Sequence, residues 1–270
     1  MGERNLRDVH QGEMMMKFIR SRVLSGEFMA GAWCNLGSSL TAEMAARTGF
    51  DWILFDQEHG PGDSITVLHQ IQAVEAWPAA PLVRITWNEM PRFKRALDLG
   101  ASGIIVPYVQ TREEAEYAAA SMRYTPEGLR GVAASPRATG FAENFKEYYA
   151  SANDNLLTVV QIETGKTLDN LDDIAAVNGV DVLFVGPLDL SISLNTPNQF
   201  EDDRFLEALK AVGRAAKEKG KAAGILLPKA DWLDLVTGFG FSFVAIGADG
   251  GMVSAGMAKS LEALSMKKKI

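Results

Sequence analysis

Residues 51–60 read Asp-Trp-Ile-Leu-Phe-Asp-Gln-Glu-His-Gly, and the fold prediction starts from this stretch. Its first half, Trp52–Asp56, is a continuous run of large apolar residues that ends in an acid, which is typical of a buried strand. Glu58 and His59 follow in the turn after that strand, and a Gly-Pro-Gly segment then separates them from a helix. The stretch therefore predicts a buried strand that carries Asp56, Glu58 and His59 to one rim of a sheet.

The same unit, a short apolar strand followed by a helix, recurs along the chain. We expect the other strands at residues 28–34, 81–86, 103–107, 156–163, 181–185, 222–227 and 242–246. Continuous apolar strands that alternate with helices are typical of a parallel sheet covered by helices. Eight such units predict an α/β fold, a (β/α)₈ TIM barrel that forms a single domain over residues 1–270. An open, doubly wound sheet is the alternative.

Three segments need separate predictions. Residues 9–24 predict an amphipathic N-terminal helix, and residues 253–266 predict a C-terminal helix. Residues 168–177 predict one continuous helix between two strands. Residues 124–153 form an unusually long connection, rich in Pro and Gly, with a short aromatic helix expected near 142–149. A connection of this length inside a compact domain is usually functional.

The composition excludes several classes of protein. The net charge of −7 argues against a nucleic-acid partner. The single cysteine, Cys34, excludes an intramolecular disulfide and fits a reducing compartment. No apolar run reaches the roughly 18–20 residues of a membrane span. We therefore expect a cytoplasmic protein that acts on small molecules and has no nucleic-acid or membrane partner.

In a (β/α)₈ barrel the active site forms where the C-terminal ends of the strands meet. The residues expected at this rim are Asp56, Glu58 and His59 after one strand, Arg84 on the next, then Gln161, Glu163 and Asp189. Other strand ends are apolar, and Trp33 is one example. A histidine, an arginine, an amide and several carboxylates around one apolar hole favour a reaction site over a set of structural ion pairs.

Two of the acids, Glu163 and Asp189, follow adjacent strands. With Gln161 and water they offer an all-oxygen ligand set, which suits Mg²⁺, Mn²⁺ or Co²⁺ better than zinc. The alternative is that each acid caps the helix that follows it.

Arg84 and His59 each allow a structural and a functional interpretation. A buried Arg84 needs an anionic partner, which is either Asp56 or Glu58 or else a substrate oxyanion. Histidine is the usual general acid–base side chain, and the position of His59 beside the rim favours that role over a structural one.

With these residues in place, the chain resembles the HpcH/HpaI aldolases, the metal-dependent (class II) pyruvate aldolases that act on 4-hydroxy-2-oxo acids such as 2-dehydro-3-deoxyglucarate. The matching segments cover nearly the whole chain. In order they are 49–52 with 56–59, 83–88, 130–132, 160–164 and 186–191.

The resemblance implies a role for each rim residue. Glu163 and Asp189 would bind the divalent metal, which pyruvate chelates through its keto and carboxylate oxygens. Arg84 would steady the enolate oxygen, and His59, supported by Asp56, would take part in proton transfer, with metal-bound water as a possible base. The substrate-binding residues would be Arg84, Gln161, Gly186, Pro187, Leu188, Trp33 and Leu226.

The resemblance also implies an assembly. Family members are commonly homohexamers, built as dimers of trimers, in which the last helix packs on a neighbouring subunit and the acid at Asp98 reaches an adjacent site. Two features depart from the family. Leu188 stands where the family usually has Ala, and the loop at 133–150, a candidate place for the aldehyde pocket, differs.

The function expected from the resemblance is that of a carbon–carbon lyase, which cleaves or forms 4-hydroxy-2-oxo acids through a metal-bound pyruvate enolate. An oxaloacetate decarboxylase and a CoA-thioester lyase of the citrate-lyase type are alternatives on the same site. A catalytically inactive oxoacid-binding subunit is the alternative outside enzymes.

Overall fold

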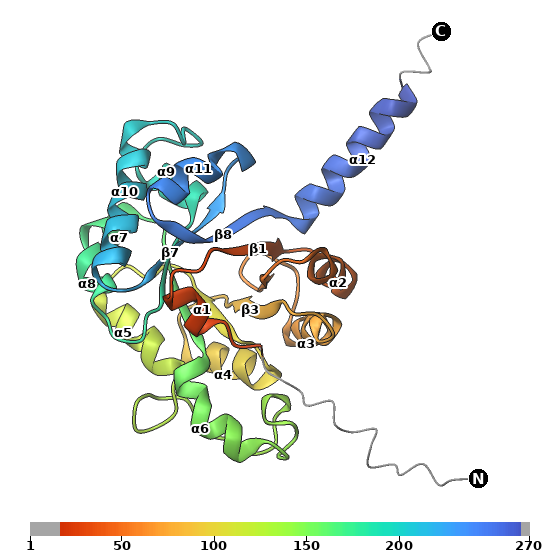
Figure 1. Cartoon of the computed structure of the whole chain (residues 1–270), viewed down its shortest axis with the longest axis vertical. Coiled ribbons are helices and arrows are strands. Elements are labelled where there is room, and N and C mark those ends of the chain that lie inside the picture. Colours follow the sequence, from red (N-terminus) through yellow and green to blue (C-terminus); the bar gives the residue numbers. More distant parts are fainter. Residues whose placement is uncertain (1–16, 266–270) are drawn as a thin grey trace.

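The computed structural model describes residues 17–265, and its strands form one closed parallel barrel in the order β1 to β8 (Figure 1). The strands are β1 (Met29–Cys34), β2 (Trp52–Asp56), β3 (Ala80–Arg84), β4 (Gly103–Val106), β5 (Leu157–Ile162), β6 (Val182–Val185), β7 (Ala222–Leu227) and β8 (Phe241–Ala248). Each strand pairs in parallel with the next, and β8 pairs with β1. The predicted TIM barrel is confirmed, and the open sheet is wrong.

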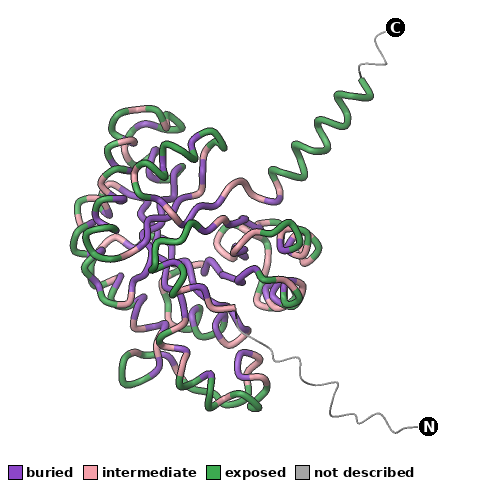
Figure 2. The backbone as a smooth tube through the Cα atoms, in the orientation of Figure 1, coloured by how far each residue is buried: buried purple, intermediate pink, exposed green. Residues whose placement is uncertain are grey.

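Most of the helices cover the outside of this barrel, while the first helix closes one of its ends and the last helix extends away from it (Figure 1). They are α1 (Arg20–Leu24), α2 (Ser39–Thr48), α3 (Ser64–Val74), α4 (Met90–Leu99), α5 (Arg112–Ser121), η2 (Arg137–Thr139), α6 (Phe145–Asn155), α7 (Gly165–Asp169), α8 (Leu171–Ala175), α9 (Pro187–Ser193), α10 (Asp203–Glu218), η3 (Ala230–Trp232), α11 (Leu233–Gly238) and α12 (Asp249–Ser265). Along the helices buried and exposed residues alternate, whereas the strand residues are almost all buried (Figure 2).

The strands are apolar throughout because each of their two faces packs in a separate core. In β2, Ile53 and Phe55 pack between the sheet and the helices. Trp52 and Leu54 point to the other face and pack inside the barrel. This alternation follows from the two-residue period of a strand. The inner core is aromatic, and Trp52 stacks on Phe243 with a centroid separation of 4.2 Å.

The short helix α1 closes the N-terminal end of the barrel. Ile19 and Val23 pack with the inner core. Arg20 Nε donates to Asp181 Oδ1 at 2.9 Å, which links α1 to the start of β6. The predicted N-terminal helix is therefore shorter than expected within the described residues, and its predicted residues 9–16 lie outside them.

The aromatic helix expected near 142–149 is present as α6, but it begins three residues later, at Phe145, and continues to Asn155. Gly140, Phe141 and Ala142 have φ angles of +60°, +56° and +85°, in the left-handed region that a helix cannot use. The predicted single helix at 168–177 is wrong. Asn170 interrupts it and donates through Nδ2 to Gln110 O at 2.9 Å.

The last helix, α12, leads away from the barrel (Figure 1) and is exposed along almost its whole length (Figure 2). Its exposed side chains include five large apolar residues: Met252, Val253, Met257, Leu261 and Leu264. In the part of the chain that the structure describes, no helix combines the length and apolar character needed to cross a bilayer.

Gly31 provides a test of the inner packing. A Cβ at this position would overlap the Trp52 indole, whereas a Cβ on Gly238 of α11 would have no atom within 4 Å. We expect Gly31→Ala to lower the free energy of unfolding by about 1–3 kcal/mol, the usual cost of an overpacked core. Gly238→Ala should not lower it, because alanine favours the helix. Urea unfolding of both variants measures the difference, and equal stabilities would contradict the packing described here.

Candidate active site

Polar side chains occupy the inner-face positions at the C-terminal ends of strands β2, β3 and β5. Asp56 is two residues beyond Leu54 on β2, and Arg84 ends β3. Gln161 occupies the corresponding place on β5, and Glu163 lies two residues further on. All four polar side chains are buried. Because alternate residues of a strand share a face, the same geometry that fills the barrel gathers these groups at its mouth.

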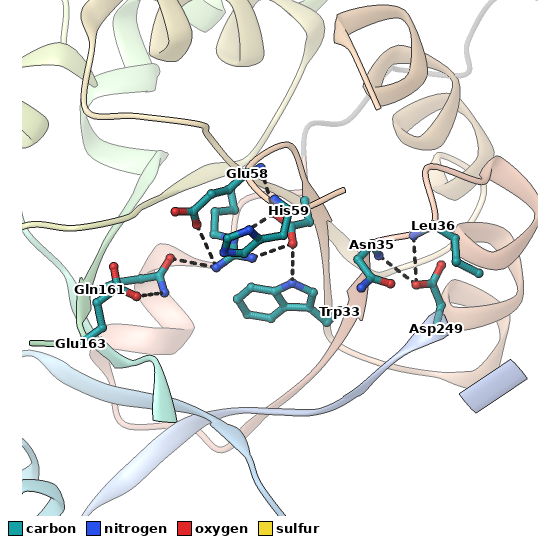
Figure 3. A network of polar contacts seen from close by, with 10 residues as sticks. Trp33, Asn35, Leu36, Glu58, His59, Gln161, Glu163 and Asp249 are labelled. Atoms are coloured by element: carbon teal, nitrogen blue, oxygen red, sulfur yellow. Dashed lines mark hydrogen bonds and ion pairs between the residues drawn. The ribbon is translucent and has the colours of Figure 1, made fainter. Parts of the chain in front are cut away.

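Asp56 and Arg84 form a bidentate ion pair at this mouth. Arg84 Nε donates to Asp56 Oδ1 at 2.9 Å, and Nη2 donates to Oδ2 at 2.6 Å. Trp33 Nε1 donates to the same Oδ2 at 3.1 Å, and the guanidinium carbon lies 4.8 Å from the Trp33 ring centroid. The backbone N–H groups of Glu58 and His59 donate to Asp56 Oδ1 at 3.0 and 3.3 Å (Figure 3).

These contacts keep Asp56 ionised. Burial would raise the pKa of its carboxyl, but the hydrogen bonds and charge of Arg84, with the donors from Trp33 and His59, hold that pKa below its ordinary value. Asp56 is therefore a fixed negative charge that orients Arg84. The predicted ion pair of Arg84 is present with both acids, because its Nη1 also lies 3.0 Å from Glu58 Oε2.

From Arg84 a chain of polar contacts continues to Glu163. Arg84 Nη1 donates to Gln161 Oε1 at 3.4 Å, and Gln161 Nε2 donates to Glu163 Oε2 at 2.8 Å (Figure 3). The backbone N–H of Tyr108 donates to Glu163 Oε1 at 2.7 Å. The side-chain amide of Gln161 therefore lies between Arg84 and Glu163 and sets the distance between them.

Glu163 is only 3% exposed. Burial raises the pKa of its carboxyl to about 7, and the negative charges of Glu58 and Asp189 add to the rise. Gly186 gives this carboxylate its space, because a Cβ there would lie 2.8 Å from Glu163 Oε2. The predicted position of Gly186 beside the site therefore has a steric reason.

Neither acid caps a helix with its side chain, so the capping alternative is wrong. Helix α7 is capped by Thr164, and α9 begins after Gly186 without a side-chain cap. The helix α9 itself was not predicted. Pro187 at its first position favours a helical start, and Asp189 lies exposed in its first turn.

The donor set fits a hard divalent cation. Among residues 17–265 no three His, Cys, Asp or Glu side chains are grouped as a metal site. Glu163 and Asp189 are nevertheless close enough for one charge to raise the pKa of the other group, and Gln161 lies beside them. A cation would relieve this repulsion, and two carboxylates with an amide and water supply oxygen ligands of the kind that Mg²⁺ or Mn²⁺ accepts.

His59 lies exposed in the turn after β2. Asp56 holds it through its backbone N–H, and within the described residues the imidazole has no hydrogen-bond partner. The support that Asp56 was expected to give His59 is thus a hydrogen bond to the backbone of the turn, and the imidazole is exposed to solvent.

The apolar residues expected at the site come from three strand ends. Trp33 ends the inner row of β1, Leu226 packs against the inner core from β7, and Pro187 is buried at the start of α9. Leu188, the residue that departs from the family pattern, is 47% exposed beside Asp189.

Two predicted features lie at the other end of the same barrel. Asp98 belongs to the last turn of α4, which leads into the start of β4, and it pairs with Arg130 at 2.9 Å. Within the 133–150 loop, Arg137 Nη1 donates to Leu99 O at 3.0 Å, which holds this loop beside the same helix end. Within one chain these residues and this loop are remote from Glu163.

Two residues of the rim were not predicted. Tyr108 has a φ of +58° and reaches Glu163 through its backbone, which no side-chain pattern signals. Asp249, at the junction of β8 and α12, accepts hydrogen bonds from the backbone N–H groups of Asn35 and Leu36 at 2.8 and 3.2 Å (Figure 3). The sequence does offer one signal for Asp249: it is a single acid in a glycine-rich segment, residues 247–251, at the end of a strand.

The chain was compared with known proteins. A family model described as HpcH/HpaI aldolase/citrate lyase matches residues 29–255. A pyruvate aldolase of Rhizobium etli is 41% identical over 245 residues, 90% of this chain and 96% of the relative. A 5-keto-4-deoxy-D-glucarate aldolase of Salmonella arizonae is 40% identical over 229 residues, 85% of this chain and 89% of the relative. A crystal structure of an HpcH/HpaI aldolase/citrate lyase family protein from Burkholderia cenocepacia superposes with a TM-score of 0.87 at 33% identity, covering 92% of this chain and 98% of that one.

The raised pKa of Glu163 gives a prediction for stability in metal-stripped protein. Between the ordinary pKa of 4.5 and about 7, the folded chain binds more protons at this site than the unfolded chain. Stability should therefore fall as the pH rises through this window, by on the order of 2–3 kcal/mol. Glu163→Gln removes the titrating group, so the variant should lose less stability than wild type between pH 5 and pH 8. Urea unfolding at both pH values tests this, and identical losses would contradict it.

Proposed function

The chain belongs to the HpcH/HpaI aldolase/citrate lyase family, and from this premise we propose that it is a divalent-metal-dependent pyruvate aldolase. Its aldolase relatives make it a carbon–carbon lyase. The reaction proposed is cleavage or formation of 4-hydroxy-2-oxo acids, with pyruvate and an aldehyde as the two halves. The observation that supports it most is the array from Arg84 through Gln161 to Glu163, because it sets a cationic donor opposite an acidic ligand site.

In this proposal Glu163 and Asp189 hold the cation, which is Mg²⁺, Mn²⁺ or Co²⁺. When bound, it supplies Lewis-acid polarisation of the oxoacid carbonyl. Pyruvate lies between this site and Arg84, with Gln161 beside it. Gly186 leaves room for Glu163, and Trp33, Pro187, Leu188 and Leu226 form the apolar wall.

The chain's own groups account for the remaining steps. In cleavage, the C4 hydroxyl loses its proton and the C3–C4 bond breaks. Its electron pair passes into the pyruvate half as an enolate, and the other half leaves as an aldehyde. Arg84 donates hydrogen bonds to the enolate oxygen, where charge develops. His59 accepts the C4 proton, and return of a proton to C3 gives pyruvate. Asp56 acts indirectly, because its carboxylate is already bonded to Arg84.

The proposal extends to assembly and location. We expect one barrel domain over residues 1–270 that forms a homohexamer, a dimer of trimers, in the cytoplasm. Asp98 would then contribute to a neighbouring subunit's site, which suits its distance from the site of its own chain. The exposed apolar stripe of α12 would be covered by a neighbour.

Proton exchange tests the reaction without any choice of aldehyde. Metal-stripped protein is incubated with pyruvate in D₂O, with and without Mg²⁺, Mn²⁺ or Co²⁺, and the methyl signal is followed by proton NMR. We expect metal-dependent loss of the signal in wild type and background rates for Glu163→Gln. Arg84→Lys should slow exchange by about 100-fold, since it removes a planar oxyanion donor.

The matched control for Glu163→Gln is Glu207→Gln, which changes an exposed acid on α10 that pairs with Lys210. It should exchange at the wild-type rate. Absence of metal-dependent exchange in folded wild-type protein would refute the aldolase proposal.

Sedimentation tests the assembly. Met257 and Leu261 stand four residues apart on one face of α12 and are both exposed. We expect wild type to sediment as a hexamer and Leu261→Asp to shift toward smaller species, because a charge would be buried against the neighbour. Lys259→Glu, on another face of the same helix, is the control. A monomeric wild type, or an equal shift in both variants, would count against the proposed role of α12.

A further inference from the structure

The acid Glu58 lies against Arg84 at the barrel mouth, and the reaction proposed above gives it no role. Its Oε2 is 3.0 Å from Arg84 Nη1, and the two side chains are only 19% and 8% exposed. Withdrawing a carboxylate from water is costly, so its position beside the oxyanion donor of the site needs a reason.

The three guanidinium nitrogens of Arg84 are divided between its partners. Asp56 holds Nε and Nη2 through the two short bonds of the ion pair. Nη1 is the nitrogen that Asp56 does not hold, and it contacts both Gln161 Oε1 and Glu58 Oε2 (Figure 3). The polar array from Arg84 to Glu163, which supports the proposed pyruvate site, begins at this same Nη1. A ligand oxygen placed between Arg84 and Glu163 therefore meets Nη1 where Glu58 already lies.

Glu58 is held to Arg84 less firmly than Asp56 is. Within the described part of the chain, Glu58 Oε2 is buried but accepts no hydrogen bond, so its contact with Nη1 is an ion pair alone. The backbone of Glu58 is fixed, because its N–H donates to Asp56 Oδ1 at 3.0 Å. Rotation of the Glu58 side chain on this fixed backbone is enough to release Nη1, while Asp56 keeps the guanidinium in place.

Such a release favours one class of ligand. A ligand with an anionic oxygen replaces the Glu58 carboxylate charge for charge, so the nearly buried guanidinium stays compensated. A neutral oxygen does not make up for the lost ion pair. The cation proposed at Glu163 and Asp189 attracts anionic oxygens as well, so it adds to this preference.

We propose that Glu58 is a specificity-determining gate at Arg84. Its carboxylate holds Nη1 in the empty site, and it rotates away when an oxyanion of the oxoacid takes its place. This inference rests on the proposed aldolase function, in which Arg84 is the oxyanion donor. Displacing Glu58 lowers the apparent affinity for every ligand of Arg84. Only an anionic ligand regains the lost interaction, so Glu58 restricts the site to anionic oxoacids and returns to Nη1 when the product leaves.

The test measures the binding of oxalate, a planar anion shaped like the pyruvate enolate, to Mg²⁺-loaded protein by isothermal titration calorimetry. Glu58→Gln removes the competing charge and should lower the dissociation constant of oxalate about threefold to tenfold. Glu58→Asp keeps the charge, but its side chain is one methylene shorter and no longer reaches Nη1. It should therefore bind oxalate more tightly as well, whereas a general effect of rim charge would leave it equal to wild type. The KM for pyruvate in D₂O exchange should fall in both variants.

The matched control is Glu89→Gln, which removes an exposed acid that pairs with Arg92 in the segment after β3. It should bind oxalate with the wild-type dissociation constant, and urea unfolding checks that all three variants are folded. Unchanged or weaker oxalate binding in Glu58→Gln, or tighter binding in Glu58→Gln but not in Glu58→Asp, would overturn the inference. If wild type binds oxalate and exchanges pyruvate in these cases, only the gate fails. If wild type neither binds oxalate nor exchanges pyruvate, the proposed function fails and the gate with it.

Discussion

The ion pair between Asp56 and Arg84 is the constraint on which the mouth of the barrel depends. A guanidinium inside a barrel loses its hydration and needs a carboxylate in exchange. Asp56 meets that need through two bonds, and it also holds Trp33 and the turn that carries Glu58 and His59. The remaining Arg84 nitrogen is thereby directed toward Gln161 and the acid beyond it. One carboxylate thus sets the orientation of three strand ends.

Much of this could be predicted from sequence because the strand period carries it. Once Trp52 and Leu54 are assigned to the inner face of β2, Asp56 must follow them to the rim. The same reasoning places Arg84, Gln161 and Glu163. The barrel itself follows from eight short apolar strands that alternate with helices. What was predicted best is therefore what depends on local periodicity and parallel topology.

The features that were missed depend on backbone conformation or on contacts between distant segments. Nothing in the side-chain pattern signals that Tyr108 adopts a positive φ or that its N–H meets Glu163. The late start of α6 was missed for the same kind of reason. Residues 140–142 all have positive φ angles, but only one of the three is a glycine, so the sequence does not signal that conformation. Asp98 and the 133–150 loop were associated with the site by resemblance, and only the fold shows that they lie at the far end of their own barrel.

The hydrogen bonds from Asn35 and Leu36 to Asp249 have a consequence for synthesis of the protein. The loop after β1 is among the first parts of the barrel to leave the ribosome, yet its carboxylate partner, Asp249, follows the last strand of the barrel. The pairing of β8 with β1, which closes the barrel, must also wait until β8 has been synthesised. The rim beside Trp33 is therefore completed only after β8 and Asp249 have been synthesised, and chains that stop before Asp249 lack these contacts however well their earlier strands have paired.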